Sequence, residues 1–165
     1  MCIIPEHIGN DKKNKAANFF RTSQERPNAP PCAFLEMKKL KIILIDDSPE
    51  DIELAVHTLK RNEYISGIDH FKEAKKAIEF LDKETPEEIS GLFILLDMNM
   101  PGMGGLDFIR MVKAEEKTKN IPIAVLTSTT ELPDIKESMR LGVKYYIPKP
   151  IESEDINKIA VELGF

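Results

Sequence analysis

The stretch LKIILIDD, residues 40–47, is a short apolar run that ends in two adjacent carboxylates. The same arrangement recurs three more times: Asp97 follows LFILL (92–96), Thr127 follows IAVL (123–126), and Lys149 follows YYIP (145–148). Such runs are too short for buried helices and are typical of strands buried on both faces. If these strands are parallel, their carboxyl ends meet at one edge of a sheet, where open α/β sheets bind ligands.

Segments with helical periodicity separate the apolar runs. Apolar residues at i, i+3, i+4 and i+7 predict helices over 52–59, 74–81 and 156–163, and weaker versions of the pattern cover 106–112 and 132–141. Residues 65–71 form the weakest predicted strand, because Gly67, Asp69 and His70 interrupt its apolar character. With that strand the chain has five strand-helix units. This alternation predicts an α/β fold, a doubly wound parallel sheet covered by helices on both faces.

Length and composition favour one domain and exclude a membrane span. The 165 residues suit a single domain, and no apolar stretch approaches the ~18 residues that a spanning helix requires. The net charge of -5 gives no general attraction to nucleic acid phosphates, so we expect no direct DNA binding.

The first 36 residues differ from the rest of the chain. Pro27, Pro30 and Pro31 interrupt a polar stretch without sustained periodicity. We therefore expect residues 1–36 to be a flexible N-terminal extension or a gene-model artefact, with Met37 as the initiator in the second case, and residues 37–165 to be the folded domain. Cys2 and Cys32 both lie in this first segment without metal-ligand spacing, and incidental thiols are favoured over a disulfide.

The turn after residue 45 carries both a helix start and an acidic pair. Ser48 is a predicted N-cap, Pro49 suits the first turn, and Asp51 stands three residues after Ser48 as in a capping box. Asp46 and Asp47 remain unexplained, because adjacent carboxylates repel each other unless solvent or a cation separates them. A carboxylate cluster facing a hydroxyl and an ammonium suits a divalent cation and a phosphoryl group better than an apolar substrate.

In their order and spacing, the motifs at the strand ends resemble the receiver domain of two-component response regulators. The motifs are Asp46-Asp47, Asp97, Met100-Pro101, Gly105-Leu106, Thr127 and Lys149-Pro150. The resemblance covers about residues 38–165. It implies a flavodoxin-like (βα)5 fold with strand order 2-1-3-4-5, and a cis peptide before Pro150. Gly104 departs from the family pattern, which often has an aspartate at that helix cap.

The resemblance assigns a metal site and an acceptor. It implies that Asp97 receives a phosphoryl group from a sensor histidine kinase or a phosphotransfer protein and becomes 4-aspartylphosphate. Mg²⁺ would be held by the carboxylates of Asp47 and Asp97 and the main-chain carbonyl of Asn99, with Asp46 acting mainly through a bound water. An anionic nucleophile that approaches an anionic phosphoryl group needs such an oxygen-liganded cation.

The resemblance also assigns the phosphoryl contacts and the switch. Lys149 and Thr127 would contact phosphoryl oxygens, and Thr127 and Tyr146 would move together to reshape the face around residues 131–163. The implied function is a phosphorelay response regulator that is cytoplasmic and catalyses only its own phosphotransfer and dephosphorylation. Because only 16 residues follow Lys149, we expect a stand-alone receiver that acts on a protein target, with a homodimer left open.

Three alternatives compete with this interpretation. A haloacid dehalogenase-type hydrolase has its nucleophile first in an Asp-x-Asp motif, whereas here the acidic pair precedes Asp97. A flavodoxin-like electron carrier is disfavoured because Asp46 and Asp47 would repel a phosphate that lacks a cation. A non-phosphorylated pseudo-receiver that only binds partners is the remaining alternative, and it differs from the main interpretation in lacking a kinase partner.

Overall fold

The computed structural model describes residues 38–128 and 132–165, which form a five-stranded parallel sheet with the order β2-β1-β3-β4-β5. The predicted fold class and strand order are thereby confirmed. The strands are β1 (Leu40–Ile45), β2 (Ile65–Phe71), β3 (Leu92–Asp97), β4 (Ile123–Thr127) and β5 (Tyr145–Pro148). The helices are α1 (Pro49–Leu59), α2 (Ala74–Leu81), α3 (Pro86–Ile89), α4 (Gly105–Ala114), α5 (Leu132–Arg140) and α6 (Ser153–Leu163). The predicted N-terminal extension and both cysteines lie outside the described residues.

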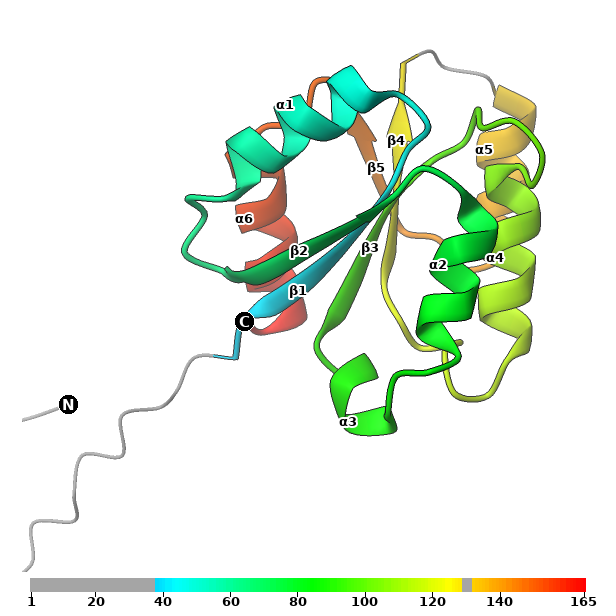
Figure 1. Ribbon diagram of the computed structural model, residues 1–165, viewed down its shortest axis with the longest axis horizontal. Helices are drawn as coiled ribbons and strands as arrows, with labels where there is room; N and C mark the ends of the chain where they lie inside the picture. Colours follow the sequence, from blue (N-terminus) through cyan, green and yellow to red (C-terminus); the bar gives the residue numbers. More distant parts are fainter. Residues whose placement is uncertain (1–37, 129–131) are drawn as a thin grey trace, which may run out of the picture. The chain divides into compact units, whose positions relative to one another are not determined.

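Helices cover both faces of the sheet, and each face has its own core. Helices α1 and α6 lie on one face, while α2 and α4, with α5 beside them, lie on the other (Figure 1). Alternate residues of β1 feed the two cores: Ile42 and Leu44 face α1 and α6, whereas Ile43 and Ile45 face α2 and α4. Every residue of β3 is buried, which explains why its sequence is a continuous apolar run.

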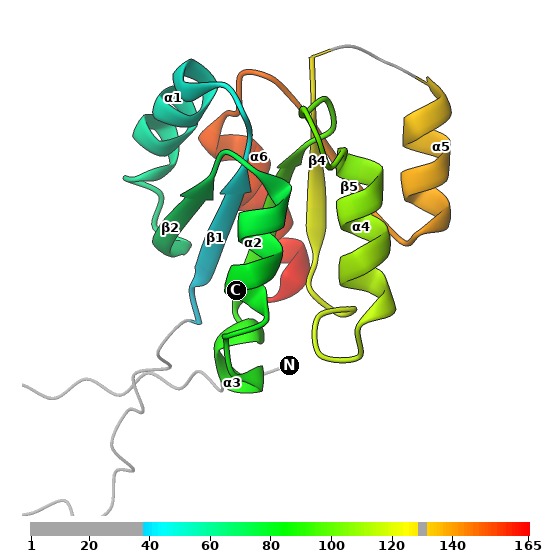
Figure 2. The same cartoon turned by 45° about the vertical axis from the view of Figure 1, so that its right-hand side comes forward.

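The strand register brings the four polar strand ends to one edge. Ile45 of β1 pairs with Leu96 of β3, and Asp97 pairs with Leu126 of β4. Thr127, the next residue, pairs with Pro148 of β5. Figure 2 shows the strands running in parallel toward this edge. The acidic, hydroxyl and amine positions that follow the apolar runs are therefore neighbours in space.

The weakest predicted strand is confirmed and one helix was not predicted. The segment 65–71 pairs with β1 as the edge strand β2 despite its polar residues. The charged connection after α2 contains the short helix α3, which was not predicted. Thr85 and Glu88 form a complete capping box around it, and Pro86 begins it. Four residues are too few to show a helical period, so only the caps could have revealed α3.

None of the helices in the two described segments has both the length and the apolar character needed to cross a bilayer.

Candidate functional site

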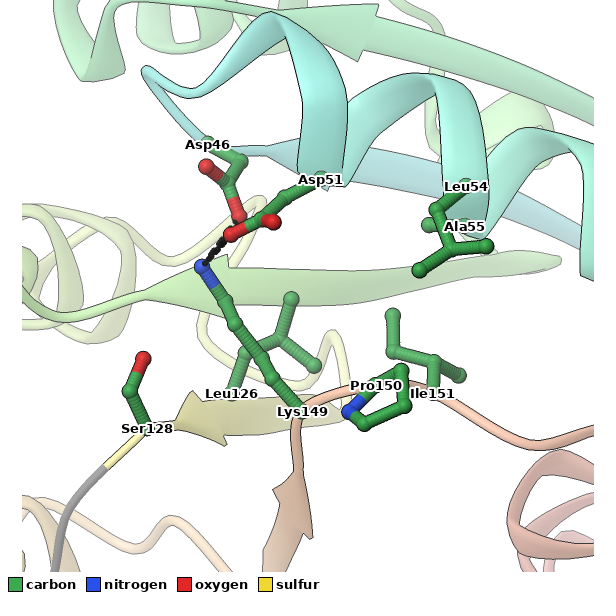
Figure 3. A pocket seen from close by; sticks show the side chains of 9 residues that line it. All are labelled: Asp46, Asp51, Leu54, Ala55, Leu126, Ser128, Lys149, Pro150 and Ile151. Atoms are coloured by element: carbon green, nitrogen blue, oxygen red, sulfur yellow. Dashed lines mark hydrogen bonds and ion pairs between the residues drawn. The ribbon is translucent and has the colours of Figure 1, made fainter.

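Lys149 lies at the centre of a cluster of carboxylates at the carboxyl edge of the sheet. Its Nζ is 2.6 Å from Asp46 Oδ2, 2.9 Å from Asp97 Oδ1 and 2.9 Å from Asp51 Oδ2. Figure 3 shows the ammonium pointing at Asp46 and Asp51. An ammonium group has three N–H donors, so each donor of Lys149 has a carboxylate acceptor.

The backbone around Lys149 fixes where its side chain begins. The Lys149 N–H donates to the carbonyl of Thr127 at 2.9 Å, which ties the residue after β5 to the end of β4. The Lys149–Pro150 peptide is cis, as the family resemblance implied. With its side chain only 15% exposed, the ammonium lies at the edge of the sheet and not in open solvent.

Asp46 and Asp97 are the buried members of the cluster. Their side chains are 2% and 7% exposed. The second oxygen of each carboxylate accepts a backbone hydrogen bond: Asp46 Oδ1 from Ser48 N–H at 2.9 Å, and Asp97 Oδ2 from Asn99 N–H at 2.9 Å. Buried carboxylates need such partners, because removing an unpaired charge from water is costly.

Burial and pairing shift two ionisation equilibria in the cluster. Burial raises the pKa of Asp46, and the hydrogen bonds from Lys149 and from Ser48 N–H offset only part of that effect. Burial alone would lower the pKa of Lys149, but its hydrogen bonds to Asp46, Asp51 and Asp97 outweigh burial and raise that pKa above its ordinary value. Lys149 therefore stays charged at neutral and moderately alkaline pH.

The remaining predicted site residues line the same edge without joining the cluster. Asp47 is exposed, and among the described residues its side chain has no hydrogen bond or ion pair. Asn99 and Thr127 line one small cavity between the ends of β3 and β4. The Thr127 hydroxyl has no partner within the two described segments. The structure thus brings the side chains of Asp46, Asp97 and Lys149 into contact. The side chains of Asp47, Asn99 and Thr127 lie beside them, and the Asn99 backbone N–H contacts Asp97.

Tyr146 is held by α5. Its hydroxyl lies 2.8 Å from Ser138 Oγ, and Ser138, which is fully buried, donates to the carbonyl of Ile135 at 2.9 Å. The Tyr146 hydroxyl also lies 3.5 Å from the Ile135 carbonyl, so it can donate either to that carbonyl or to Ser138 Oγ. The aromatic ring packs against the core under α2 and α4.

Asp51 is a site residue that the sequence analysis missed. Its backbone N–H donates to Ser48 Oγ at 3.2 Å, as predicted for an N-cap. The return bond of a capping box is absent from the described residues, because Ser48 N–H donates to Asp46 instead. The predicted capping box is therefore wrong in its second half, and the free carboxylate binds Lys149, 98 residues away. No local sequence signal indicates such a distant partner.

A cavity of about 360 Å³ opens beside Lys149, between α1 and the segment after β5 (Figure 3). Its walls are largely apolar, and Leu54 on α1 is half exposed at its rim. The lining residues are Asp46, Asp51, Leu54, Ala55, Leu126, Ser128, Lys149, Pro150 and Ile151. On the α1 side the cavity thus reaches Asp46, Asp51 and Lys149, whereas Asp97 is not among its lining residues.

Gly105 shapes the segment that follows Asp97. A Cβ at Gly105 would lie 2.8 Å from Met98 Cα and 3.0 Å from the Asp97 carbonyl oxygen, which is too close for any side chain. We expect Gly105→Ala to displace residues 97–99 and to lower the free energy of unfolding by about 1–3 kcal/mol, measured by urea unfolding. Gly67→Ala is the matched control, because a Cβ there has nothing within 4 Å. Equal stability of both variants would show that this contact does not constrain the segment.

The donor set at this edge suits a hard divalent cation. Asp46, Asp47 and Asp97 supply carboxylate oxygens. The hydrogen bond from Asn99 N–H to Asp97 places the Asn99 backbone next to the Asp97 carboxylate. Oxygen-only donors are those that Mg²⁺ and Mn²⁺ prefer. Within the described residues, however, no three acidic, histidine or cysteine side chains form a ready-made metal group. Lys149 occupies the point where the carboxylates converge, so a cation would share Asp46 and Asp97 with it.

Comparison with known proteins identifies one family. Residues 42–161 match the family model of the response regulator receiver domain. Two-component response regulator ORR1 of Oryza sativa subsp. japonica is 34% identical over 123 residues, which cover 72% of this chain and 53% of ORR1. The chain thus spans about half the length of the rice relative.

Shorter relatives match along nearly all of their length. Chemotaxis protein CheY1 of Helicobacter pylori strain J99 is 30% identical over 126 residues, which cover 76% of this chain and 98% of CheY1. Among solved structures, the Mn²⁺-bound form of response regulator Rcp1 superposes with a TM-score of 0.58 at 27% identity, covering 75% of this chain and 91% of Rcp1.

Proposed function

Because this chain belongs to the response-regulator receiver family, we propose that Asp97 accepts a phosphoryl group in a two-component phosphorelay, with Mg²⁺ bound beside it. Receiver domains are generally signalling modules that interact with histidine kinases or phosphotransfer proteins, and they do not process an external substrate. The observation that carries the proposal is the contact of 2.9 Å between the buried Asp97 carboxylate and the Lys149 ammonium, and Lys149 also lines the cavity.

The proposed reaction is a nucleophilic displacement at phosphorus. A carboxylate oxygen of Asp97 attacks the phosphoryl group of a phosphohistidine, the P–O bond forms, and the P–N bond breaks as imidazole leaves. Lys149 remains protonated throughout, because the surrounding carboxylates hold its pKa above the ordinary value. Its positive charge offsets the repulsion between the attacking carboxylate and the phosphoryl oxygens.

Four residues of this chain would hold the cation. Asp46, Asp47 and Asp97 offer carboxylates and Asn99 its main-chain carbonyl, and Mg²⁺ commonly fills its remaining positions with water. When bound, Mg²⁺ would neutralise the charge that builds up on the phosphoryl oxygens. The Mn²⁺-bound structure of the relative Rcp1 supports a divalent site in this family.

Removing Mg²⁺ should stop phosphorylation. We expect the chain to gain one acid-stable, base-labile phosphoryl group when it is incubated with acetyl phosphate and Mg²⁺, and none when a chelator replaces Mg²⁺. Without the cation, the anionic acceptor and the anionic donor repel each other. Intact-mass spectrometry measures the gain, and restoring Mg²⁺ to the chelated sample is the control. Equal labelling with and without Mg²⁺ would contradict the role of the cation.

Thr127 and Tyr146 would transmit the phosphorylated state. A phosphoryl group adds up to about two negative charges and three acceptor oxygens, so it requires new donors. The Thr127 hydroxyl, which ends β4 beside Asn99, can supply one of them. Movement of Thr127 toward the phosphoryl group would then free Tyr146 to change its packing against α5.

Ser138→Ala should favour the phosphorylated conformation. In the proposed switch, phosphorylation moves Tyr146 away from Ser138, so losing their hydrogen bond removes an interaction that stabilises only the conformation in which Tyr146 contacts α5. A typical hydrogen bond of this kind changes an equilibrium by roughly threefold to tenfold, and we expect the affinity for beryllofluoride, a phosphoryl mimic, to rise by that factor. Titration with Mg²⁺ present measures the affinity.

Tyr146→Phe is the matched variant for this bond, since it keeps the ring and removes only the hydroxyl. We expect it to raise the affinity by the same factor, and the double variant to add nothing further. Unchanged affinity in both single variants would show that the bond survives activation.

A further inference from the structure

One of the three carboxylates around Lys149 has no part in the proposed chemistry. Asp97 is the proposed acceptor and a cation ligand, and Asp46 belongs to the proposed cation site. Asp51 is neither, although its Oδ2 is 2.9 Å from the Lys149 ammonium, the same distance as Asp97 Oδ1. The ammonium thus has one partner that neither phosphorylation nor cation binding would remove.

The fold places the Asp51 carboxylate where it can hold Lys149. Its backbone N–H is fixed by Ser48 Oγ at the first turn of α1, and its side chain is released from the capping box because Ser48 N–H binds Asp46. The carboxylate then points across the mouth of the cavity to Lys149 (Figure 3). At 44% exposed, it is far more accessible than Asp46 or Asp97, so water can satisfy its other oxygen.

We propose that Asp51 is a positioning residue. It keeps the Lys149 ammonium next to Asp97 when Asp46 and Asp97 bind the cation and Asp97 reacts with the phosphoryl group. This inference rests on the proposed function. The lysine side chain has four rotatable methylene groups beside an open cavity, and ordering it costs entropy. A carboxylate anchored on α1 restricts that freedom before the phosphoryl group arrives, which is the usual benefit of preorganisation.

The test compares Asp51→Asn and Asp51→Ala with Glu50→Gln. Glu50 is an exposed carboxylate in the same first turn of α1, so its variant removes one charge without touching Lys149. We expect beryllofluoride, with Mg²⁺ present, to bind about threefold to tenfold more weakly to Asp51→Ala, the range for the loss of one hydrogen bond. The loss should be smaller for Asp51→Asn, whose amide oxygen can still accept from Lys149. The affinity of Glu50→Gln should match that of the parent. The midpoint of thermal unfolding checks that each variant is folded.

Two further measurements separate positioning from a general effect of charge or structure. In a Lys149→Met background, Asp51→Asn should not weaken beryllofluoride binding any further, because Asp51 acts only through the Lys149 ammonium. With Mg²⁺ present and no beryllofluoride, NMR of the Lys149 Nζ protons should show slower exchange with water in the parent than in Asp51→Ala.

The outcomes also distinguish this inference from the proposed function. If the parent fails to bind beryllofluoride with Mg²⁺ while the NMR difference is present, the proposed function fails and the anchoring of Lys149 stands. Tighter or equal binding by the Asp51 variants would overturn the inference. An equal loss of affinity in the Lys149→Met background would overturn it as well.

Discussion

Replacing Asp97 with asparagine should abolish phosphorylation of this chain by acetyl phosphate. The variant keeps the shape of the side chain and the acceptor for Asn99 N–H, but an amide oxygen is a far weaker nucleophile than a carboxylate. Asp97 is buried and paired with Lys149, surroundings that it shares with Asp46, and it is the resemblance to receiver domains that assigns the acceptor role to Asp97. Intact-mass spectrometry after incubation with Mg²⁺ should show one phosphoryl group on the parent and none on the variant.

Asp107→Asn is the control for this experiment. Asp107 lies in the first turn of α4, where its exposed side chain pairs with Arg110. Its variant should be phosphorylated like the parent. Full labelling of Asp97→Asn would mean that another group accepts the phosphoryl group and that the proposed acceptor is wrong.

Lys149→Met should cause the largest loss of stability in the site. The change leaves the buried Asp46 and Asp97 carboxylates without their shared cation, and removing one partner from a buried charge cluster costs about 3 kcal/mol or more. Urea unfolding in the presence of a chelator measures the loss. Added Mg²⁺ should recover part of it, because a cation that binds the folded state stabilises that state.

Lys76→Met provides the matched control for the loss of a lysine ion pair. Lys76 pairs with Glu73 at the start of α2, and both side chains are exposed. Solvent screens an exposed ion pair, so it contributes little to stability and this variant should unfold close to the parent. If Lys149→Met and Lys76→Met lower the free energy of unfolding equally, Lys149 does not stabilise the buried carboxylates of Asp46 and Asp97 more than an exposed ion pair would.

The pH dependence of the Lys149 contribution follows from the direction of its pKa shift. The pKa is raised in the folded state relative to an ordinary lysine, near 10.4 in an unfolded chain. The stabilisation is therefore fully present below about pH 10, and it is lost as pH rises through the folded-state pKa. The difference in unfolding free energy between parent and Lys149→Met should stay constant from about pH 7 to 10 and shrink above that range.

The strands and helices could be predicted because each produces a pattern among residues that are close together in the sequence. Continuous apolar runs identify β1, β3 and β4, and the 3.6-residue period identifies α1, α2 and α6. The edge strand β2 was uncertain because one side of an edge strand tolerates residues such as Asp69 and His70. Helix α3 was missed because four residues show no period and its signal lies in the Thr85–Glu88 cap.

The site was predicted only in part, because one of its contacts joins residues that lie far apart in the sequence. The rule that parallel strands share a carboxyl edge was sufficient to gather Asp46, Asp97 and Lys149, and the structure places them in contact. The Asp51–Lys149 pair joins residues 98 positions apart, and a capping box gave Asp51 an adequate local explanation. The assigned roles in metal binding, phosphoryl transfer and switching stay predictions.

The most direct test of the central claim is chemical identification of the phosphorylated side chain. An aspartyl phosphate is an acyl phosphate, which borohydride reduces to an alcohol, so the residue becomes homoserine. After phosphorylation with acetyl phosphate and Mg²⁺, reduction and peptide sequencing by mass spectrometry, we predict homoserine at position 97 and unchanged aspartate at positions 46, 47 and 51. Homoserine at one of those three positions, or a parent chain without any modification under these conditions, would contradict the account.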